Sequence, residues 1–71
     1  MPKRYTAGEI ESYLKKGGFT IVSQKGSHRK WRNSETGKQV IVPWHQGKTL
    51  PVGTMMSIVN GSGLGKEFFN I

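Results

Sequence analysis

The stretch "FTIVSQKGSHRKWRNSETGKQVIVP", residues 19–43, decides the fold of this chain of 71 residues. It contains three runs rich in β-favouring residues, which are 19–25, 28–32 and 38–43. Gly26-Ser27 forms a tight turn between the first two runs, and residues 33–37 form a longer turn before the third. The pattern predicts an antiparallel meander of three strands.

Helical signals flank the strands on both sides. Before them, Thr6 and Glu9 have the spacing of a capping box, and apolar residues then recur at helical spacing up to Gly17-Gly18. After Pro51, apolar residues predict a second helix that ends near Asn60-Gly61. The order α-β-β-β-α predicts one α+β domain over residues 1–71. Both helices should cover one face of the sheet and leave the other face open.

Strand alternation divides the second strand into two faces. His28, Lys30 and Arg32 share one face, whereas Arg29 and Trp31 share the other. Because Trp31 is the large apolar residue, its face should be the core side. His28 is then expected on the open face with two cations, unless the strand slips by one residue.

The charge is concentrated in the middle of the chain. Eleven Lys and Arg stand against four Glu and no Asp, which gives a net charge of +7. Six of the cations and only one acid lie within residues 25–48, whereas residues 49–71 sum to zero. A basic block of this kind attracts polyanions, above all RNA or DNA, although its positive field would also attract an acidic protein.

Several features bear on the compartment. The chain has no cysteine, which excludes disulfides and thiolate metal sites and suits a reducing compartment. Its N-terminus lacks the apolar segment of a signal peptide, and no apolar run approaches the length of a membrane span. We therefore expect a soluble cytoplasmic protein without a membrane partner.

The sequence contains no convincing motif for a metal site, a catalytic triad or a nucleotide-binding loop. Metal-dependent nucleases need clustered carboxylates, and the four Glu are scattered. Two histidines without a third suitable ligand do not make a zinc site. Ser27 beside His28 has no Asp to orient a catalytic triad. The "GKT" at 47–49 and the "GSGLGKE" at 61–67 both lack the first glycine of a phosphate loop. No metal or small-molecule cofactor is expected.

A metal-free reaction on RNA remains. Histidine exchanges protons near neutral pH, and RNA carries its own nucleophile, the 2′-OH. His28 could act as general acid or base, while Lys30 and Arg32 stabilise the pentacovalent transition state. The residues alone leave a second interpretation open, in which His28 is an ordinary solvated side chain.

Other aromatic and polar residues also have two interpretations. His45 is either a second acid/base group facing His28 or a loop residue bonded to the backbone. Trp44 either stacks on a base or plugs the edge of the core. Phe68 and Phe69 either pack onto the core or meet a partner. In each case we favour the packing or loop role.

The strings "GSHRKW" at 26–31, "VIVP" at 40–43 and "PVGTMMSI" at 51–58 resemble the HicA (YcfA-like) family of mRNA interferase toxins. The resemblance spans most of the chain. It implies a fold like a double-stranded-RNA-binding domain, and ribosome-independent cleavage of mRNA by a single histidine, which maps onto His28. It also implies a HicB-type antitoxin that covers this site. The expected RNA-contacting residues are Lys25, Gly26, Ser27, Lys30 and Arg32.

The chain departs from the family at its C-terminus. It has "SIVNGSGL" where family members resemble "SILKQAGL", so the second helix is expected to end early or fray. The segment after Leu64 has no family counterpart, and we expect at most one more short turn there.

The favoured prediction is thus a metal-independent RNA endonuclease toxin. Two rivals remain open. One is a non-catalytic module that grips duplex RNA by shape and phosphate contacts. The other is an adaptor that chiefly binds an acidic protein.

Overall fold

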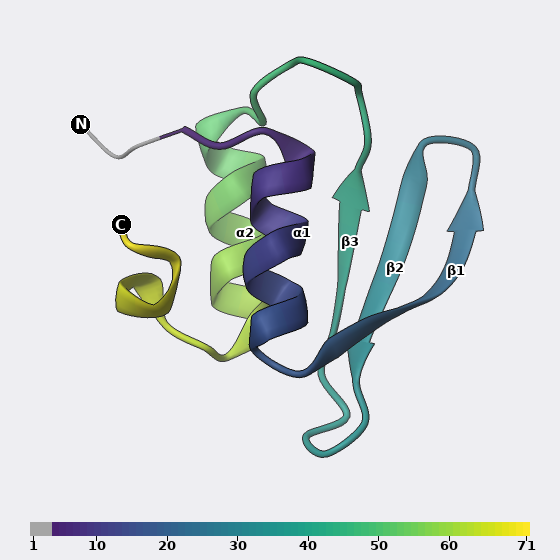
Figure 1. The fold of residues 1–71 in the computed structure, drawn as a ribbon, viewed down its shortest axis with the longest axis vertical. Helices are drawn as coiled ribbons and strands as arrows, with labels where there is room; N and C mark the ends of the chain where they lie inside the picture. Colours follow the sequence, from purple (N-terminus) through teal and green to yellow (C-terminus); the bar gives the residue numbers. More distant parts are fainter. Residues whose placement is uncertain (1–3) are drawn as a thin grey trace.

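The computed structural model describes residues 4–71 and has the order α-β-β-β-α followed by one short helix (Figure 1). The elements are α1 Ala7–Lys16, β1 Phe19–Lys25, β2 His28–Asn33, β3 Gln39–Pro43, α2 Val52–Ser62 and the 3₁₀ helix η1 Lys66–Phe69. The strands form one antiparallel sheet in the order β1-β2-β3, so the predicted α+β meander is confirmed. Residues 1–3 of the predicted domain lie outside the described part.

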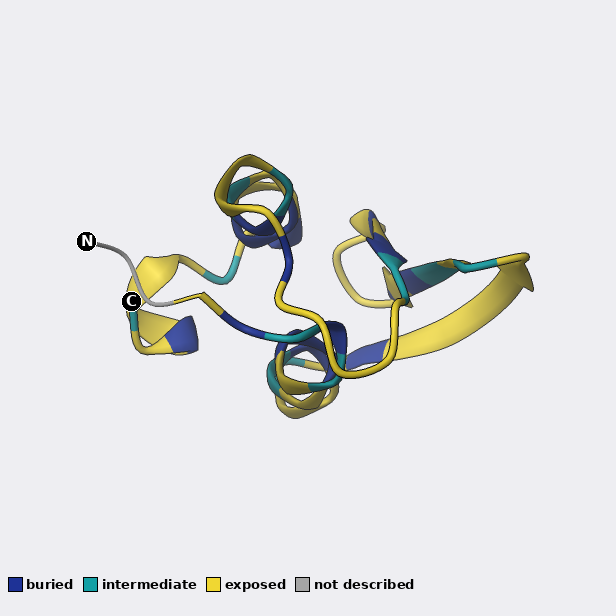
Figure 2. Cartoon of the chain, turned by 90° about the horizontal axis from the view of Figure 1, so that it is seen from above, coloured by how far each residue is buried: buried dark blue, intermediate teal, exposed yellow. Residues whose placement is uncertain are grey.

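The helices and the sheet form two layers, and the C-terminal segment adds a third. Figure 2 shows α1 and α2 on the same side of the sheet, with the other side of the sheet uncovered. The helix η1 contacts both α1 and α2 on their side away from the sheet. The predicted open face is therefore present in the structure.

Helix α1 begins at the predicted capping box. The backbone N–H of Glu9 donates to Thr6 Oγ1 at 3.2 Å, and Glu9 Oε1 accepts from the backbone N–H of Thr6 at 2.9 Å. The helix ends at Gly17, and Gly18 then turns the chain into β1 with a φ of +94°. The side chains on its buried face are Ala7, Ile10, Glu11 and Leu14.

The β1–β2 hairpin contains a bulge that the sequence did not reveal. The turn at Gly26-Ser27 pairs Lys25 with His28, and Gly26 has the positive φ of +59° that such a tight turn requires. The register then shifts between Ile21 and Ser23, so Val22 is the extra residue. As a result Ile21, and not Val22, is the partner of Trp31.

Strand β2 is one residue longer than predicted, and Asn33 closes it instead of opening the following turn. The Asn33 side chain is buried, and its Oδ1 accepts from the backbone N–H groups of Glu35 at 2.9 Å and Thr36 at 3.3 Å. Its Nδ2 donates to the carbonyl of Gly17 at 3.2 Å. One side chain thus organises the β2–β3 turn and ties it to the end of α1.

Helix α2 corrects the expectation of an early end near Asn60-Gly61, because it continues to Ser62. Gly61 lies against Val40 of β3, where a Cβ would come within 3.3 Å of Cγ1, so its lack of a side chain serves close packing. Ser62 Oγ donates to the carbonyl of Val59 at 2.7 Å within the last turn. Gly63, with a φ of +71°, ends the helix.

The C-terminal segment packs onto the core, as predicted. Phe69 is fully buried, with its ring 5.6 Å from the Tyr13 ring, whereas Phe68 remains 39% exposed. The Tyr5 hydroxyl donates to the carbonyl of Phe69 at 2.7 Å. Burial raises the pKa of the Tyr5 phenol above its ordinary value.

A buried carboxylate joins α1 to the core face of β2. Glu11 is only 5% exposed, and its Oε1 accepts from Arg29 Nη1 at 2.9 Å. Its Oε2 accepts from Trp31 Nε1 at 2.8 Å. Both donors must face α1 to reach this carboxylate. The prediction that Arg29 and Trp31 share the core side of β2 is therefore confirmed.

We expect Glu11→Ala to destabilise the fold by about 1.5–3 kcal/mol, because Arg29 and Trp31 would both lose a hydrogen bond to a charged acceptor. Urea unfolding followed by Trp fluorescence measures this change. Glu35→Ala is the matched control, since Glu35 lies exposed in the β2–β3 turn. Equal midpoints for the two variants would contradict the role given to Glu11.

We expect Phe69→Ala to cost about 3–5 kcal/mol, since it removes a fully buried aromatic side chain. Phe68→Ala, at the neighbouring half-exposed ring, should cost about 1 kcal/mol. Denaturant midpoints of both variants test whether η1 belongs to the core. A C-terminal segment that does not stabilise the fold would give two small and similar losses.

Candidate nucleic-acid interface

The open face of the sheet carries a shallow depression centred on His28. Its volume is about 270 Å³, and its lining residues are Ser23, Lys25, His28, Lys30 and Ile41. All three strands contribute to it. In the register, Lys25 pairs with His28, and Lys30 pairs with both Ser23 and Ile41. The depression is therefore a direct product of strand pairing.

Three of the predicted site residues meet in this depression. His28 is exposed, Lys25 is its cross-strand partner, and Lys30 follows two residues later on the same face. The imidazole thus has an ammonium group on its own strand and another on the neighbouring strand. This arrangement can hold a phosphate and exchange a proton with it.

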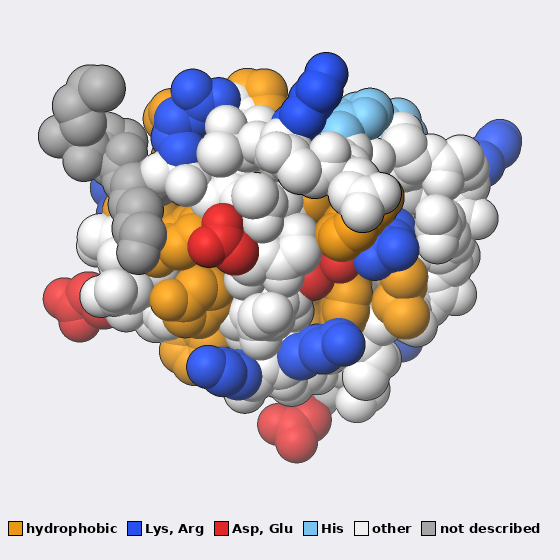
Figure 3. All heavy atoms as spheres, turned by 45° about the horizontal axis from the view of Figure 1, so that its top comes forward, with side chains coloured by type: hydrophobic (Ala, Val, Ile, Leu, Met, Phe, Trp, Pro, Cys, Tyr) orange, Lys and Arg blue, Asp and Glu red, His pale blue; other side chains and the backbone are white. Residues whose placement is uncertain are grey.

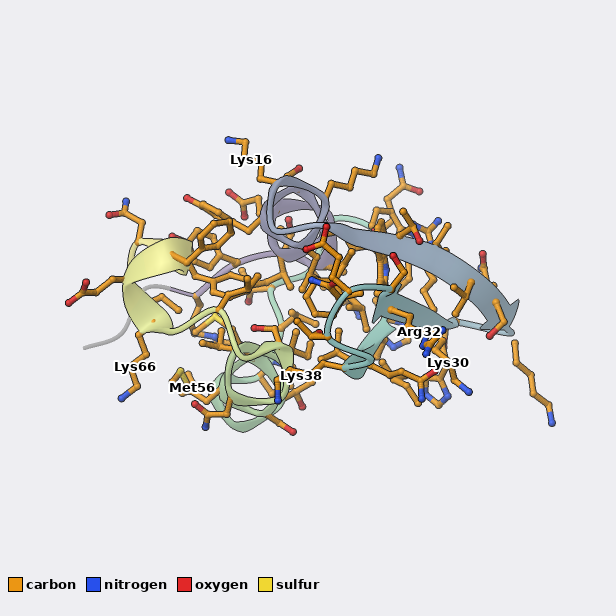
Figure 4. All side chains as sticks on the ribbon, turned by 90° about the horizontal axis from the view of Figure 1, so that it is seen from below. Lys16, Lys30, Arg32, Lys38, Met56 and Lys66 are labelled. Atoms are coloured by element: carbon orange, nitrogen blue, oxygen red, sulfur yellow. The ribbon has the colours of Figure 1, made fainter. Side chains whose placement is uncertain are left out.

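The other predicted residues lie beside the depression. Gly26 and Ser27 form the turn, and the carbonyl of Ser27 accepts from the backbone N–H of Trp44 at 2.6 Å. Arg32 pairs with Thr20 and Gln39 further along the same face. Figure 4 shows Lys30 and Arg32 on the side of the sheet away from the helices. Arg32 thus extends the basic face without lining the depression.

Sequence reasoning missed Ser23 and Ile41 as lining residues. Ile41 is 52% exposed, so it offers an apolar surface between the cations. The hairpin register was the signal that could have found Ser23, because a tight turn at Gly26-Ser27 places Ser23 opposite Lys30. The partner of Lys30 on β3 depends on the longer β2–β3 turn, whose register the sequence does not fix.

Trp44 has the packing role that we favoured. It is half-buried, and the Arg29 guanidinium lies over its ring at 4.1 Å. The ring also packs against α1 at Gly8, where a Cβ would come within 3.4 Å. Since Arg29 already covers the ring, Trp44 does not form part of the exposed basic surface.

His45 does not share the depression with His28. It lines a separate cavity of about 370 Å³ together with Pro43, Lys48 and residues of the following loop. The hypothesis of a second acid/base group facing His28 gains no support from this placement. Figure 3 shows histidine atoms on the upper rim of the molecule, with Lys or Arg atoms on both sides.

Residues 4–71 contain neither a cluster of metal-ligand side chains nor a membrane-spanning helix. No group of three His, Cys, Asp or Glu side chains in this part of the chain could hold a metal ion. No helix in it is both long and apolar enough to cross a membrane.

A family model described as "HicA toxin of bacterial toxin-antitoxin" matches residues 7–64. The match covers both α-helices and all three strands and stops before η1. No curated protein matches the chain. The matched region includes the depression with His28, Lys25 and Lys30. The chain belongs to the HicA toxin family, and is thus the toxin of a toxin–antitoxin system whose partner is an antitoxin.

Proposed function

We propose that this toxin is an RNA endonuclease that cuts mRNA in the cytoplasm, with His28 as the general acid/base. The observation that carries the proposal is the depression that His28 shares with Lys25 and Lys30. It combines one group that exchanges protons near neutral pH with two groups that attract phosphate. Membership of the HicA toxin family supports the same conclusion.

The reaction uses the nucleophile of the substrate. Neutral His28 removes the proton from a 2′-OH, whose oxygen attacks the adjacent phosphorus while the bond from phosphorus to the 5′ oxygen breaks. The resulting imidazolium returns a proton to the departing 5′ oxygen. The products are a 2′,3′-cyclic phosphate and a 5′-OH end. Lys25 and Lys30 stabilise the extra negative charge of the pentacovalent transition state.

The positions of Glu9 and Glu11 and the lining of the depression support a reaction without a metal ion. Glu11 is occupied by Arg29 and Trp31 on the core side, and Glu9 is occupied by the helix cap. None of the residues that line the depression is acidic. The cations therefore take over the charge stabilisation that a metal gives in other nucleases.

The antitoxin is proposed to be of HicB type and to cover this face. No element of the described chain covers this face of the sheet. The charged residues that line its depression are both cations. A partner with an acidic surface would match it and exclude RNA.

We expect His28→Ala to abolish RNA cleavage in the presence of EDTA while the protein stays folded, because His28 is exposed. Added imidazole should restore part of the rate, since it supplies the missing proton acceptor in solution. Gel analysis of a labelled RNA measures both effects. A 2′-deoxy nucleotide at the cut position should block cleavage by the unmodified protein.

Full activity of His28→Ala would overturn the mechanism. Salt-sensitive RNA binding without any cleavage by the unmodified protein would favour a non-catalytic binding module instead.

We expect Lys30→Ala to lower kcat/KM by about 100-fold, as for the loss of one group that stabilises transition-state charge. Arg32→Ala should cost only a few-fold and mainly reduce the salt dependence of binding, because Arg32 lies outside the depression. Lys66→Ala on η1 is the control, with the same charge change on another element. Equal losses for Lys30→Ala and Lys66→Ala would show that only net charge matters.

A further inference from the structure

A second cavity lies next to the depression and has no role in the cleavage step. Its volume is about 370 Å³, which is near the lower end of the range for small-molecule sites. It lies where β3 ends and the loop to α2 begins. Its lining residues are Pro43, His45, Lys48, Thr49, Leu50, Pro51 and Thr54.

Pro43 connects this cavity to the catalytic depression. It lines the cavity and is also the cross-strand partner of His28 on β3. Neighbouring strands lie only about 4.7–4.9 Å apart. A phosphate held at His28 therefore places an adjoining nucleotide of the same RNA strand close to the cavity mouth.

The lining suits a nucleobase. Pro43, Leu50 and Pro51 give apolar walls, as a flat ring requires when it leaves water. His45 and Thr54 offer polar atoms for the edge of the ring, and an imidazole can also stack on a base. Apolar walls together with polar atoms at the edge are what a site that orients a ring requires.

The positive charge of the cavity lining favours a ligand that carries an anionic group. Lys48 lines the cavity, whereas no Asp or Glu does. A cationic ligand would find no counter-charge here, while a base carried on a phosphate backbone would find Lys48 beside it. The surrounding basic block, with six cations in residues 25–48, adds to the same preference.

We propose that this cavity binds one unpaired nucleobase of the RNA, next to the phosphate held at His28. The inference rests on the proposed RNA-cleaving function and deepens it by naming the substrate class. A base within a duplex is stacked and paired and cannot enter a cavity. The substrate is therefore single-stranded at the position that the cavity binds.

The test measures RNA binding in the His28→Ala background, which prevents cleavage. The probes are two fluorescein-labelled oligomers of equal charge, octa-adenylate and an abasic ribose-phosphate octamer, and the readout is fluorescence anisotropy. The ratio compared is the Kd of the abasic oligomer divided by the Kd of octa-adenylate. We expect this ratio to fall by about tenfold when Thr54→Phe fills the cavity, as for the loss of one stacked base. The Kd of the abasic oligomer should not change.

Asn60→Phe is the matched control, because it adds the same ring to an exposed position of the same helix. Circular dichroism checks the fold of each variant. Should Thr54→Phe fail to fold, His45→Ala and Lys48→Ala remain, since both residues are exposed. His45→Ala should lower the ratio of Kd values, whereas Lys48→Ala should weaken the binding of both oligomers.

The possible results separate this inference from the proposed function. An unchanged ratio in Thr54→Phe, or in His45→Ala where that variant is needed, would overturn the cavity assignment and leave the cleavage mechanism standing. A fall in the ratio for a protein that cuts no RNA would support the cavity and overturn the endonuclease proposal. If neither oligomer binds the His28→Ala protein, both proposals are overturned.

Discussion

The carboxylate of Glu11 is the constraint on which the arrangement of the sheet depends. A buried charge must be paired, and the two partners of Glu11, Arg29 and Trp31, both project from the same face of β2. A slip of β2 by one residue would turn both away and leave the carboxylate buried without its partners. The pairing therefore also holds the alternate residues, His28 among them, on the opposite face, which no helix covers.

The same network extends from α1 to the turn that precedes His28. Arg29 bridges Glu11 and the ring of Trp44, and the backbone N–H of Trp44 donates to the carbonyl of Ser27. The residue before His28 is thus tied to the residue after Pro43. These groups, which lie outside the depression, hold the end of the hairpin against β3, and this sets the distance between the depression and the neighbouring cavity.

Local patterns were enough to predict the order of elements and the open face, because capping, turn chemistry and alternation act over a few residues. They failed where contacts between residues far apart in the sequence determine the local structure. The bulge at Val22 breaks the alternation, and α2 continues through Asn60 and Gly61. Among the predicted RNA contacts, the register brings Lys25 and Lys30 to His28. The cavity could not be predicted, because it combines the end of β3 with the loop and first turn of α2.

The two sites meet at Pro43, and this has a consequence for inhibition. In the proposed complex, a strand of RNA with one phosphate at His28 and the adjoining base in the cavity would pass over Pro43. An antitoxin that covers this residue would then block both proposed sites together. Because Pro43, the last residue of the short edge strand β3, lacks an N–H group, it cannot donate to an added strand. A partner would therefore contact Pro43 itself through side chains, and basic neighbours such as Lys48 favour acidic ones.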